Sequence, residues 1–367
     1  MDTISKIETF DARVPLAAPL AVGSASITHR TYCLVRITTS DGIVGIGYSY
    51  SRGLPIAKII DDVIAPLAIG NTAEDPDQIR KQILAFNWQS AEHGTFTAAV
   101  SAVDVALHDV LGKRTNKSIA SLFGSTKVSV PIYSVVGYHY GDDESGLIEE
   151  INFAKTRGIK SFKIVIGAKT PERDALRLAV LRKEIGEKAE IAVDAFRTLK
   201  TLENAVTRVN LIKEYGISFV EDPFLESEGP LAIELREATG VPVSFGESLA
   251  SSKMCAQVLH YNQTDVLRLD ALVVGGVSEF FTAAKAAEKY GKTIATHIHT
   301  ELHSQLVAAI PNLYSGGMEY LDPVYEIDLF HHLLVNPIQI VDGCAVLSQS
   351  PGFGFEWDWD AIHHYSK

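Results

Sequence analysis

The sequence contains few cysteines, and their positions exclude a disulfide framework. The three of them, Cys33, Cys255 and Cys344, are odd in number, far apart and not spaced as metal ligands. Disulfide-stabilised domains use even and closely spaced sets of cysteines, whereas dispersed thiols are typical of a reducing compartment. We therefore expect a cytoplasmic protein with buried thiols.

Long apolar runs and a surplus of basic residues are also lacking. No run approaches the roughly 18 apolar residues of a membrane-spanning helix, and the opening stretch MDTISKIETF has no secretory signal pattern. The 33 Lys and Arg residues are outnumbered by 45 Asp and Glu, which gives a net charge of −12. Nucleic acids and anionic membranes bind basic surfaces, so neither is an expected partner.

The first part of the chain reads as strands followed by helices. The pattern predicts strands over 3–14, 27–39 and 43–50, and helices over about 56–67, 74–88 and 95–113. The last two strands are joined by Asp41 and Gly42, a pair typical of β-hairpins. This order indicates an α+β unit, which we place at residues 1–127.

From residue 128 the pattern changes to a regular alternation of strands and helices. Amphipathic stretches such as PERDALRLAVLRKEIGE separate eight short strands: VPIYSVV, SFKIVI, EIAVDA, ISFVED, PVSFGE, VLRLD, TIATH and GGMEYLD. Eight such units over residues 128–322 predict an α/β fold, a (β/α)8-type barrel of parallel strands. The turn-rich segment 323–367 is expected to return to the first unit, so that both form an α+β capping domain.

A charged residue stands near the C-terminal end of almost every predicted barrel strand. In order, these residues are Lys163, Asp194, Glu221, Glu247, Asp270, His297 and Glu319. The C-terminal ends of barrel strands converge on one mouth. A single acid there could be a helix cap, but recurrence in successive units indicates a functional site.

Three consecutive carboxylates, Asp194, Glu221 and Glu247, would repel one another without a cation. All-oxygen ligands suit a hard divalent ion, so we predict Mg²⁺; the absence of His or Cys argues against zinc. The alternative is neutralisation by Lys or Arg side chains, which requires three basic partners, and the strand ends supply only Lys163. Lys163 itself lies in an apolar strand, where a buried ammonium needs a partner.

The last polar positions predict proton transfer. Asp270 and His297 lie on successive strands, so the carboxylate is expected to fix the imidazole tautomer and raise its basicity. Glu319 is expected to donate a proton if burial and neighbouring acids raise its pKa. Together with the metal, these groups predict a reaction in which a carboxylate substrate loses its α-proton to His297 and forms an enolate. The metal, Lys163 and Glu319 are expected to stabilise the charge of this enolate.

These motifs resemble the enolase superfamily, and within it the mandelate racemase subgroup, over essentially the whole chain. VDAF, FVEDP and FGES resemble its metal-ligand segments, RLDALVVGGVSE and ATH its Asp–His dyad, MEYLD its glutamate segment, and SAVDVALHDVLGK the signature helix of its capping domain. The resemblance implies these roles for Asp194, Glu221, Glu247, Asp270, His297 and Glu319. It also implies a homo-oligomer, often an octamer, and cap loops at about 16–27 and 48–55, where Arg52 and Tyr48 are candidate substrate contacts.

Two departures from the subgroup bear on the reaction. Its second strand usually carries Lys-x-Lys, with the second lysine a base opposite the histidine, whereas SFKIVIG retains Lys163 and has Val165 in the second position. Lys163 is then expected to face the substrate carboxylate and the metal-site acids. Phe196 replaces a commonly polar residue, which speaks against mandelate as the substrate, and Val273 stands where some members carry a lysine.

A single base favours chemistry on one face of the substrate. We therefore predict a Mg²⁺-dependent lyase that dehydrates an acid sugar, a small carboxylate, to a 2-keto-3-deoxy acid. The alternative within the family is a racemase, epimerase or cycloisomerase that recruits a second acid or base, such as Tyr133 or Tyr138.

Two other classes fit the sequence less well. The His297–His299 pair suggests a zinc amidohydrolase, but further metal-binding histidines are lacking, and His299 and His303 are expected to be structural. A non-catalytic binding barrel would not need the whole set of Asp270, His297 and Glu319.

Overall fold

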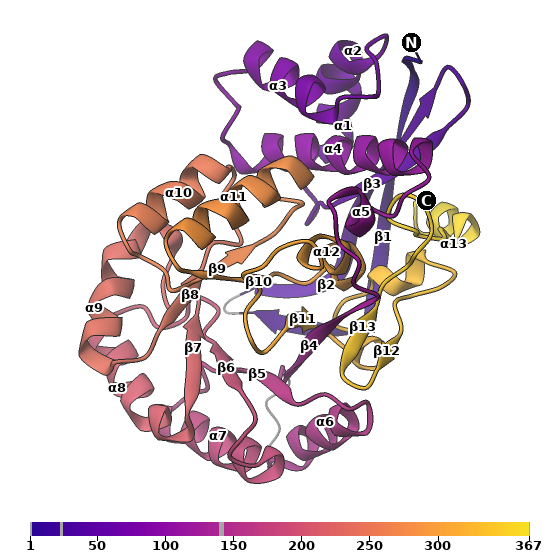
Figure 1. Cartoon of the computed structure of the whole chain (residues 1–367). Coiled ribbons are helices and arrows are strands. Elements are labelled where there is room, and N and C mark those ends of the chain that lie inside the picture. The colour runs from indigo at the N-terminus through magenta and orange to yellow at the C-terminus, as the bar shows by residue number, and fades with distance from the viewer. Residues whose placement is uncertain (1, 23–24, 139–142, 367) are drawn as a thin grey trace.

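The structure, a computed structural model, describes residues 2–22, 25–138 and 143–366. It combines an N-terminal antiparallel sheet and its helices with a ring of parallel strands enclosed by helices (Figure 1). Residues 23–24, part of the predicted cap loop 16–27, lie outside the described residues.

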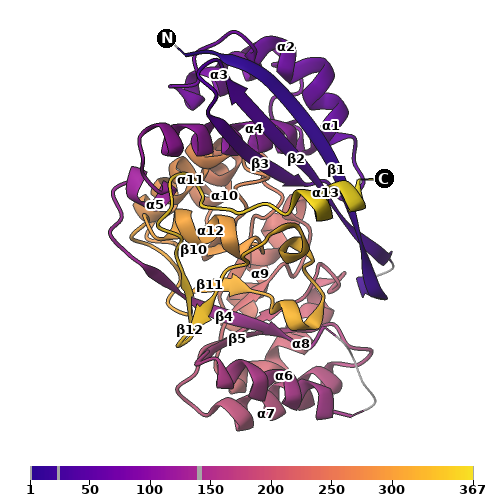
Figure 2. The ribbon, with the colours of Figure 1, turned by 90° about the vertical axis from the view of Figure 1, so that its right-hand side faces the viewer.

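The N-terminal sheet is antiparallel, with the strand order β1-β2-β3 (Figure 2). Its elements are β1 (Ile4–Val22), β2 (Ala25–Thr39), β3 (Val44–Tyr50), α1 (Ile56–Ile59), a π-helical turn (Ile60–Ile64), α2 (Ala65–Ala68), α3 (Pro76–Phe86) and α4 (Gly94–Arg114). The first two strands are longer than predicted, because Leu20 pairs with Ile27 beyond an irregularity that follows Pro15. The predicted cap loop is therefore largely a β-hairpin arm.

Helix α4 packs very close to β3. A Cβ atom on Gly45 would lie 2.3 Å from the backbone oxygen of Ala106, and one on Gly47 would lie 2.1 Å from that of Ala102, so a larger residue would force the elements apart. Within the described ranges, α4 is the one helix long and apolar enough to cross a membrane, and most of it is buried inside the fold. It is the core helix of the N-terminal region.

Two buried aspartates of α4 tie the N-terminal region to the rest of the chain. Asp104 accepts a hydrogen bond from the backbone N–H of Val277 (2.7 Å), where α11 (Val277–Lys289) begins. Asp109 accepts hydrogen bonds from the backbone N–H groups of Ile46 and Phe353, both at 2.9 Å. The helix SAVDVALHDVLGK thus satisfies backbone donors that burial would otherwise leave unpaired.

The barrel consists of parallel strands in sequence order. They are β4 (Ser129–Val136), β5 (Ser161–Val165), β6 (Ile191–Asp194), β7 (Ile217–Glu221), β8 (Val243–Phe245), β9 (Val266–Leu269), β10 (Thr293–Thr296) and β11 (Met318–Tyr320). β11 pairs with β4, and Ile294 of β10 forms a parallel bridge to Leu313, just before β11, which closes the ring. The predicted modified (β/α)8 barrel is confirmed.

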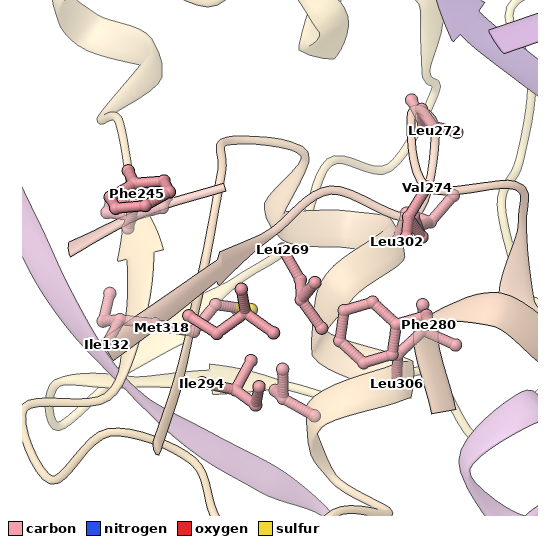
Figure 3. Packing of buried hydrophobic residues seen from close by; sticks show 14 of the residues in the cluster. Ile132, Phe245, Leu269, Leu272, Val274, Phe280, Ile294, Leu302, Leu306 and Met318 are labelled. Atoms are coloured by element: carbon pink, nitrogen blue, oxygen red, sulfur yellow. The ribbon is translucent and has the colours of Figure 1, made fainter. Parts of the chain in front are cut away.

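Helices cover the outside of this ring (Figure 1). They are α5 (Ile119–Leu122), α6 (Ser145–Thr156), α7 (Pro171–Ile185), α8 (Leu202–Ile212), α9 (Gly229–Thr239), α10 (Ser252–His260), α11 and α12 (Thr300–Val307). Leu269 of β9 and Ile294 of β10 lie beside Phe280 of α11 and Leu306 of α12 (Figure 3). This packing buries apolar side chains between strands and helices and is the main stabilising term of the barrel.

The C-terminal segment contacts both the barrel and the N-terminal sheet. β13 (Cys344–Val346) pairs with β4 and with β12 (Ile340–Val341), whereas α13 (Trp359–Tyr365) packs on β1 (Figure 2). The rings of Phe10 and Trp359 lie 5.2 Å apart, and the Arg36 guanidinium lies over both. The boundaries at 127/128 and 322/323 stay a prediction.

The alternation of side chains along each strand explains where the polar residues point. In β5, Phe162 and Ile164 belong to the core under the helices, whereas Val165 packs with residues of the barrel interior. Side chains two residues apart share a face. Inward positions therefore hold the charged residues of the barrel strands, which are Lys163, Asp194, Glu221, Arg268 and Glu319.

Candidate active site

A cavity of about 540 Å³ lies between the C-terminal ends of the barrel strands and the N-terminal sheet. Its volume falls in the range usual for small-molecule sites. Five residues that the sequence predicts for the site line it: Arg52, Asp194, Glu247, His297 and Glu319. The remaining predictions, Lys163, Glu221, Asp270 and Tyr48, lie behind this lining.

Lys163 lies beneath the cavity among the predicted metal ligands. Its Nζ is 2.6 Å from Glu221 Oε1 and 3.4 Å from Asp194 Oδ2, and it also forms an ion pair with Glu319. Burial and Arg268 would lower the pKa of Lys163, but these carboxylates outweigh both and keep it well above its usual value. Its ammonium is shared by these three acids and is not among the groups that line the cavity, so the expected contact of Lys163 with substrate stays a prediction.

Arg268 is a second buried cation, and it was not among the residues predicted for the site. Its Nε is 3.0 Å from Glu247 Oε2, its Nη1 is 2.8 Å from Glu221 Oε2, and its Nη2 is 2.9 Å from both Glu319 oxygens. Arg268 stands in the apolar strand VLRLD as Lys163 stands in SFKIVI. A basic residue within an apolar strand is therefore a feature that Arg268 shares with Lys163.

These contacts correct two expectations. The first expectation was that Lys163 is the only basic partner at the strand ends. Arg268 is a second, and Arg197 is a third, because it contacts Glu247 at 3.3 Å. The closest partner of Arg197 is Asp222, at 2.6 Å. The pKa of Glu319 is not raised: burial alone would raise it, but Arg268 and Lys163 outweigh burial and lower it to about 2. Glu319 is therefore an anion in this metal-free arrangement, and its role as a proton donor stays a prediction.

The acid cluster, which we define as Asp194, Glu221, Glu247 and Glu319 with Lys163 and Arg268, keeps an excess of negative charge. Four carboxylates share two buried cations, so two negative charges are uncompensated. Including Arg197 together with its closest partner, Asp222, gives five carboxylates to three cations and leaves the same excess of two. Glu221 Oε2 is buried without a hydrogen bond of good geometry, and burial raises the pKa of Glu221 well above its usual range. A divalent cation with oxygen ligands fits both the charge and the donor set.

His297 faces the acid cluster with a defined tautomer. Its Nδ1 lies 2.8 Å from Asp270 Oδ2, and its Nε2 lies 3.6 Å from Glu247 Oε2. Burial would raise the pKa of Asp270, but the hydrogen bond from His297 and the nearby imidazoles hold it well below its usual value. Because the ionised carboxylate accepts the Nδ1 proton, the Nε2 lone pair is free to take a proton at the cavity.

The other two histidines of this segment do not line the cavity. His303 Nδ1 donates to the carbonyl of Ile298 (2.8 Å), and its Nε2 accepts from the backbone N–H of Ala271 (3.0 Å). This neutral ring therefore joins the loops that carry Asp270 and His297. Burial lowers the pKa of His299 to about 4, so it is also neutral near pH 7.

The remaining walls of the cavity combine apolar, basic and hydroxyl-bearing side chains with one further acid, Asp328. Val165 is buried with Leu20, and Leu20 also lines the cavity, as does Phe196, whose φ is 45°. The position of Val165 therefore provides no amine that could act as a second base. Tyr48 does not reach the cavity, because its ring is fully buried and stacked on Phe330 of the C-terminal segment at 4.2 Å.

Both halves of the chain match known families. Residues 4–124 match the mandelate racemase/muconate lactonizing enzyme N-terminal domain, and residues 147–361 match the enolase C-terminal domain-like family. L-talarate/galactarate dehydratase of Salmonella typhimurium is 26% identical over 363 residues, which is 96% of this chain and 89% of that protein. Chloromuconate cycloisomerase of a Pseudomonas species is 28% identical over 380 residues, or 99% of each.

A solved structure shares the arrangement of the whole chain. The crystal structure of L-talarate dehydratase from Polaromonas sp. JS666, complexed with Mg and L-glucarate, matches with a TM-score of 0.90 at 25% identity and covers 100% of this chain and 97% of that one. Together with the matches to both family models, this likeness identifies the chain. It belongs to the mandelate racemase/muconate lactonizing subgroup of the enolase superfamily.

Proposed function

We propose that this chain is a Mg²⁺-dependent hydro-lyase that removes water from an acid sugar and gives a 2-keto-3-deoxy acid. The observation that carries the proposal is the position of His297, whose Nε2 faces the acid cluster while Asp270 holds its Nδ1. Its relatives named above include a dehydratase and a cycloisomerase, which supports the shared proton-abstraction chemistry.

His297 acts first as a base. Asp194, Glu221 and Glu247 would hold Mg²⁺, which when bound supplies positive charge to the substrate carboxylate and to the developing enolate. His297 Nε2 then takes the α-proton, and Asp270 stabilises the resulting imidazolium. Arg268, which lines the cavity, adds a fixed positive charge beside the carboxylate.

Loss of the β-hydroxyl follows on the same face. The electron pair of the enolate forms the new carbon–carbon double bond, the C–O bond breaks, and the His297 imidazolium returns its proton so that water leaves. The enol product then becomes the 2-keto acid by taking a proton at the adjacent carbon. Val165, which stands at the position of the missing lysine, and Leu20, which lines the cavity, carry no acid or base, and this favours dehydration over exchange of the proton between two faces.

A screen of mono- and diacid sugars with Mg²⁺, read out as 2-keto acid, tests this proposal. We expect at least one substrate, no product after chelation of the metal, and no product with His297→Asn. Incorporation of solvent deuterium at the α-carbon of recovered substrate, without any 2-keto acid, would contradict dehydration.

A racemase, epimerase or cycloisomerase is the second candidate, and the position of Tyr138 favours it. Tyr138 lines the cavity, whereas Tyr133 is fully buried behind it. Burial raises the pKa of Tyr138, so its hydroxyl stays protonated and could return a proton to the substrate. Loss of α-deuterium exchange in Tyr138→Phe, with exchange intact in the parent, would support this candidate.

We also propose a cytoplasmic homo-oligomer. Phe86 and Trp88, at the end of α3, are 70% and 73% exposed, which is unusual for two large apolar side chains so close in sequence. If they form a subunit contact, Phe86→Glu combined with Trp88→Glu should reduce the mass observed by sedimentation; a monomeric parent would contradict the proposal.

A further inference from the structure

The side of the cavity formed by the N-terminal sheet is rich in cationic side chains. Arg13, Arg30 and Arg52 line it together with His29 and Tyr50, and we call these five residues the cap wall. The acid cluster lies on the barrel side of the same cavity and has the opposite charge. The cavity therefore has two electrostatically different ends.

One arginine of the cap wall is already engaged. Arg30 donates to the carbonyl of Ile327 (2.7 Å) and to the hydroxyl of Tyr50. Burial would lower the pKa of Arg30, but Tyr50, Tyr32 and, to a smaller extent, Asp328 outweigh burial and raise it. Asp328 also lines the cavity, where it accepts hydrogen bonds from Tyr32 (2.8 Å) and the backbone of Phe330 (3.2 Å). Arg30 is thus held by the Ile327 carbonyl and the Tyr50 hydroxyl, and Asp328 is satisfied by other donors.

The other two arginines have no carboxylate partner. In the part of the chain that the structure describes, Arg13 and Arg52 form no ion pair; Arg13 approaches only the ring of His29, at 3.4 Å, and Arg52 lies over the ring of Tyr50 at 5.0 Å. They come from different segments, Arg13 from β1 and Arg52 from the turn after β3. Arg52 interacts with Glu247 only at longer range than an ion pair. Two guanidinium groups that line one cavity without a carboxylate at ion-pair distance form a site for an anion.

The turn that carries Arg52 is fixed to the sheet. The backbone N–H of Gly53 donates to the Thr31 hydroxyl (2.7 Å), and that of Ser51 donates to the Thr31 carbonyl (2.8 Å). Arg52 itself has a left-handed φ of 50°. A non-glycine residue held in this conformation is positioned by its surroundings, so the guanidinium starts from a fixed point at the cavity.

We propose that the substrate is a dicarboxylate, an aldaric acid, whose second carboxylate is bound by Arg13 and Arg52. This inference rests on the proposed function: the reacting carboxylate lies at the acid cluster, and the far end of the sugar reaches the cap wall. A terminal hydroxymethyl group would leave two cations without an anionic partner, whereas a carboxylate accepts their hydrogen bonds in pairs.

Matched acid sugars test the proposal. For each stereochemical series, the diacid and the corresponding monoacid are assayed with the parent, Arg13→Gln and Arg52→Gln. Lys58→Gln is the control, because Lys58 is an exposed cation of α1 that pairs with Asp62 on the surface. We expect the diacid to be preferred, and each arginine variant to raise its KM by roughly ten- to hundredfold with a smaller effect on kcat.

Binding without turnover gives a second readout. In His297→Asn with Mg²⁺, the diacid should bind more tightly than the monoacid, and adding Arg52→Gln should remove that difference. Preference for a monoacid, or equal losses for both acids, would overturn this inference while leaving the dehydratase proposal intact. If no acid sugar yields a 2-keto acid, the proposed function fails, and preferential binding of diacids still decides the role of the arginines.

Discussion

The acid cluster and the cap wall face each other across one cavity and differ in almost every physical respect. In the acid cluster, Lys163 and Arg268 are 1% and 2% exposed and each contacts three carboxylates. In the cap wall, Arg13 and Arg52 are exposed and have no acid partner within the described ranges.

This difference separates chemistry from recognition. Buried charges that neutralise one another keep a fixed geometry, which proton transfer beside a metal requires. Exposed arginines on a hairpin arm and a turn can be exchanged without disturbing a core. We therefore infer that the barrel carries the reaction and that the cap wall determines which substrate this chain accepts.

The largest expected effect comes from changing the barrel side at Asp270. Asp270→Asn removes the charge that fixes Nδ1–H on His297 and stabilises the imidazolium, so we expect kcat to fall by roughly 10²–10⁴-fold. Diacid binding at the cap wall should change little. Because the two residues act as one unit, Asp270→Asn combined with His297→Asn should be no worse than His297→Asn alone, and additive losses would contradict the dyad.

Removal of Arg268 should affect stability more than any change in the cap wall. Arg268→Met leaves three buried carboxylates short of a cation, and we expect the metal-free protein to lose roughly 3–5 kcal/mol of unfolding free energy. Mg²⁺ should restore part of this loss, because it supplies charge to the same acids. Denaturant unfolding with and without Mg²⁺ measures both effects; Arg52→Gln is the comparison and should lie near the parent.

A buried histidine should make the barrel side sensitive to acid. Burial lowers the pKa of His299 to about 4, whereas the unfolded chain binds this proton near pH 6.5. The unfolded state therefore holds more protons between these values, and stability is lost as pH falls from 6.5 to 4, by about 1.4 kcal/mol per unit. His299→Phe should reduce the slope over this window, and His93→Phe, at an exposed position, should not.

The salt concentration should have the smallest effect, and it should change substrate binding at the cap wall more than the buried charges of the acid cluster. Exposed charges are screened beyond about 8 Å at physiological ionic strength, and buried pairs much less. Raising KCl from low to physiological concentrations should increase KM for a diacid a few-fold in the parent and less in Arg52→Gln. An equal rise in both proteins would show that Arg52 does not contact the anionic group.

The barrel and most of its polar residues could be predicted because they obey periodic rules. Strand and helix units repeat along the chain, and a charged residue in an apolar strand, such as Lys163, must point inward and be paired. Arg268 obeys the same rule. It is less evident in the sequence because it lies two residues before Asp270, the last residue of its predicted strand. Its long side chain nevertheless reaches the acids.

The cap wall could not be predicted in the same way. Arg13 and His29 lie within the strands predicted over 3–14 and 27–39, but the sequence pattern does not show that this end of the sheet borders the cavity. Tyr48 and Tyr50 are two residues apart on one strand, yet only Tyr50 lines the cavity, because Phe330 from the distant C-terminal segment covers Tyr48. Such long-range contacts leave no local signal.

The rate of Mg²⁺-dependent 2-keto acid formation by His297→Asn, compared with the parent and accompanied by Mg²⁺ affinity, tests the central claim most directly. We predict a loss of roughly 10²–10⁴-fold or more in turnover with Mg²⁺ affinity close to that of the parent. Turnover that survives the substitution, or a parent reaction that proceeds equally well after removal of divalent ions, would contradict the account.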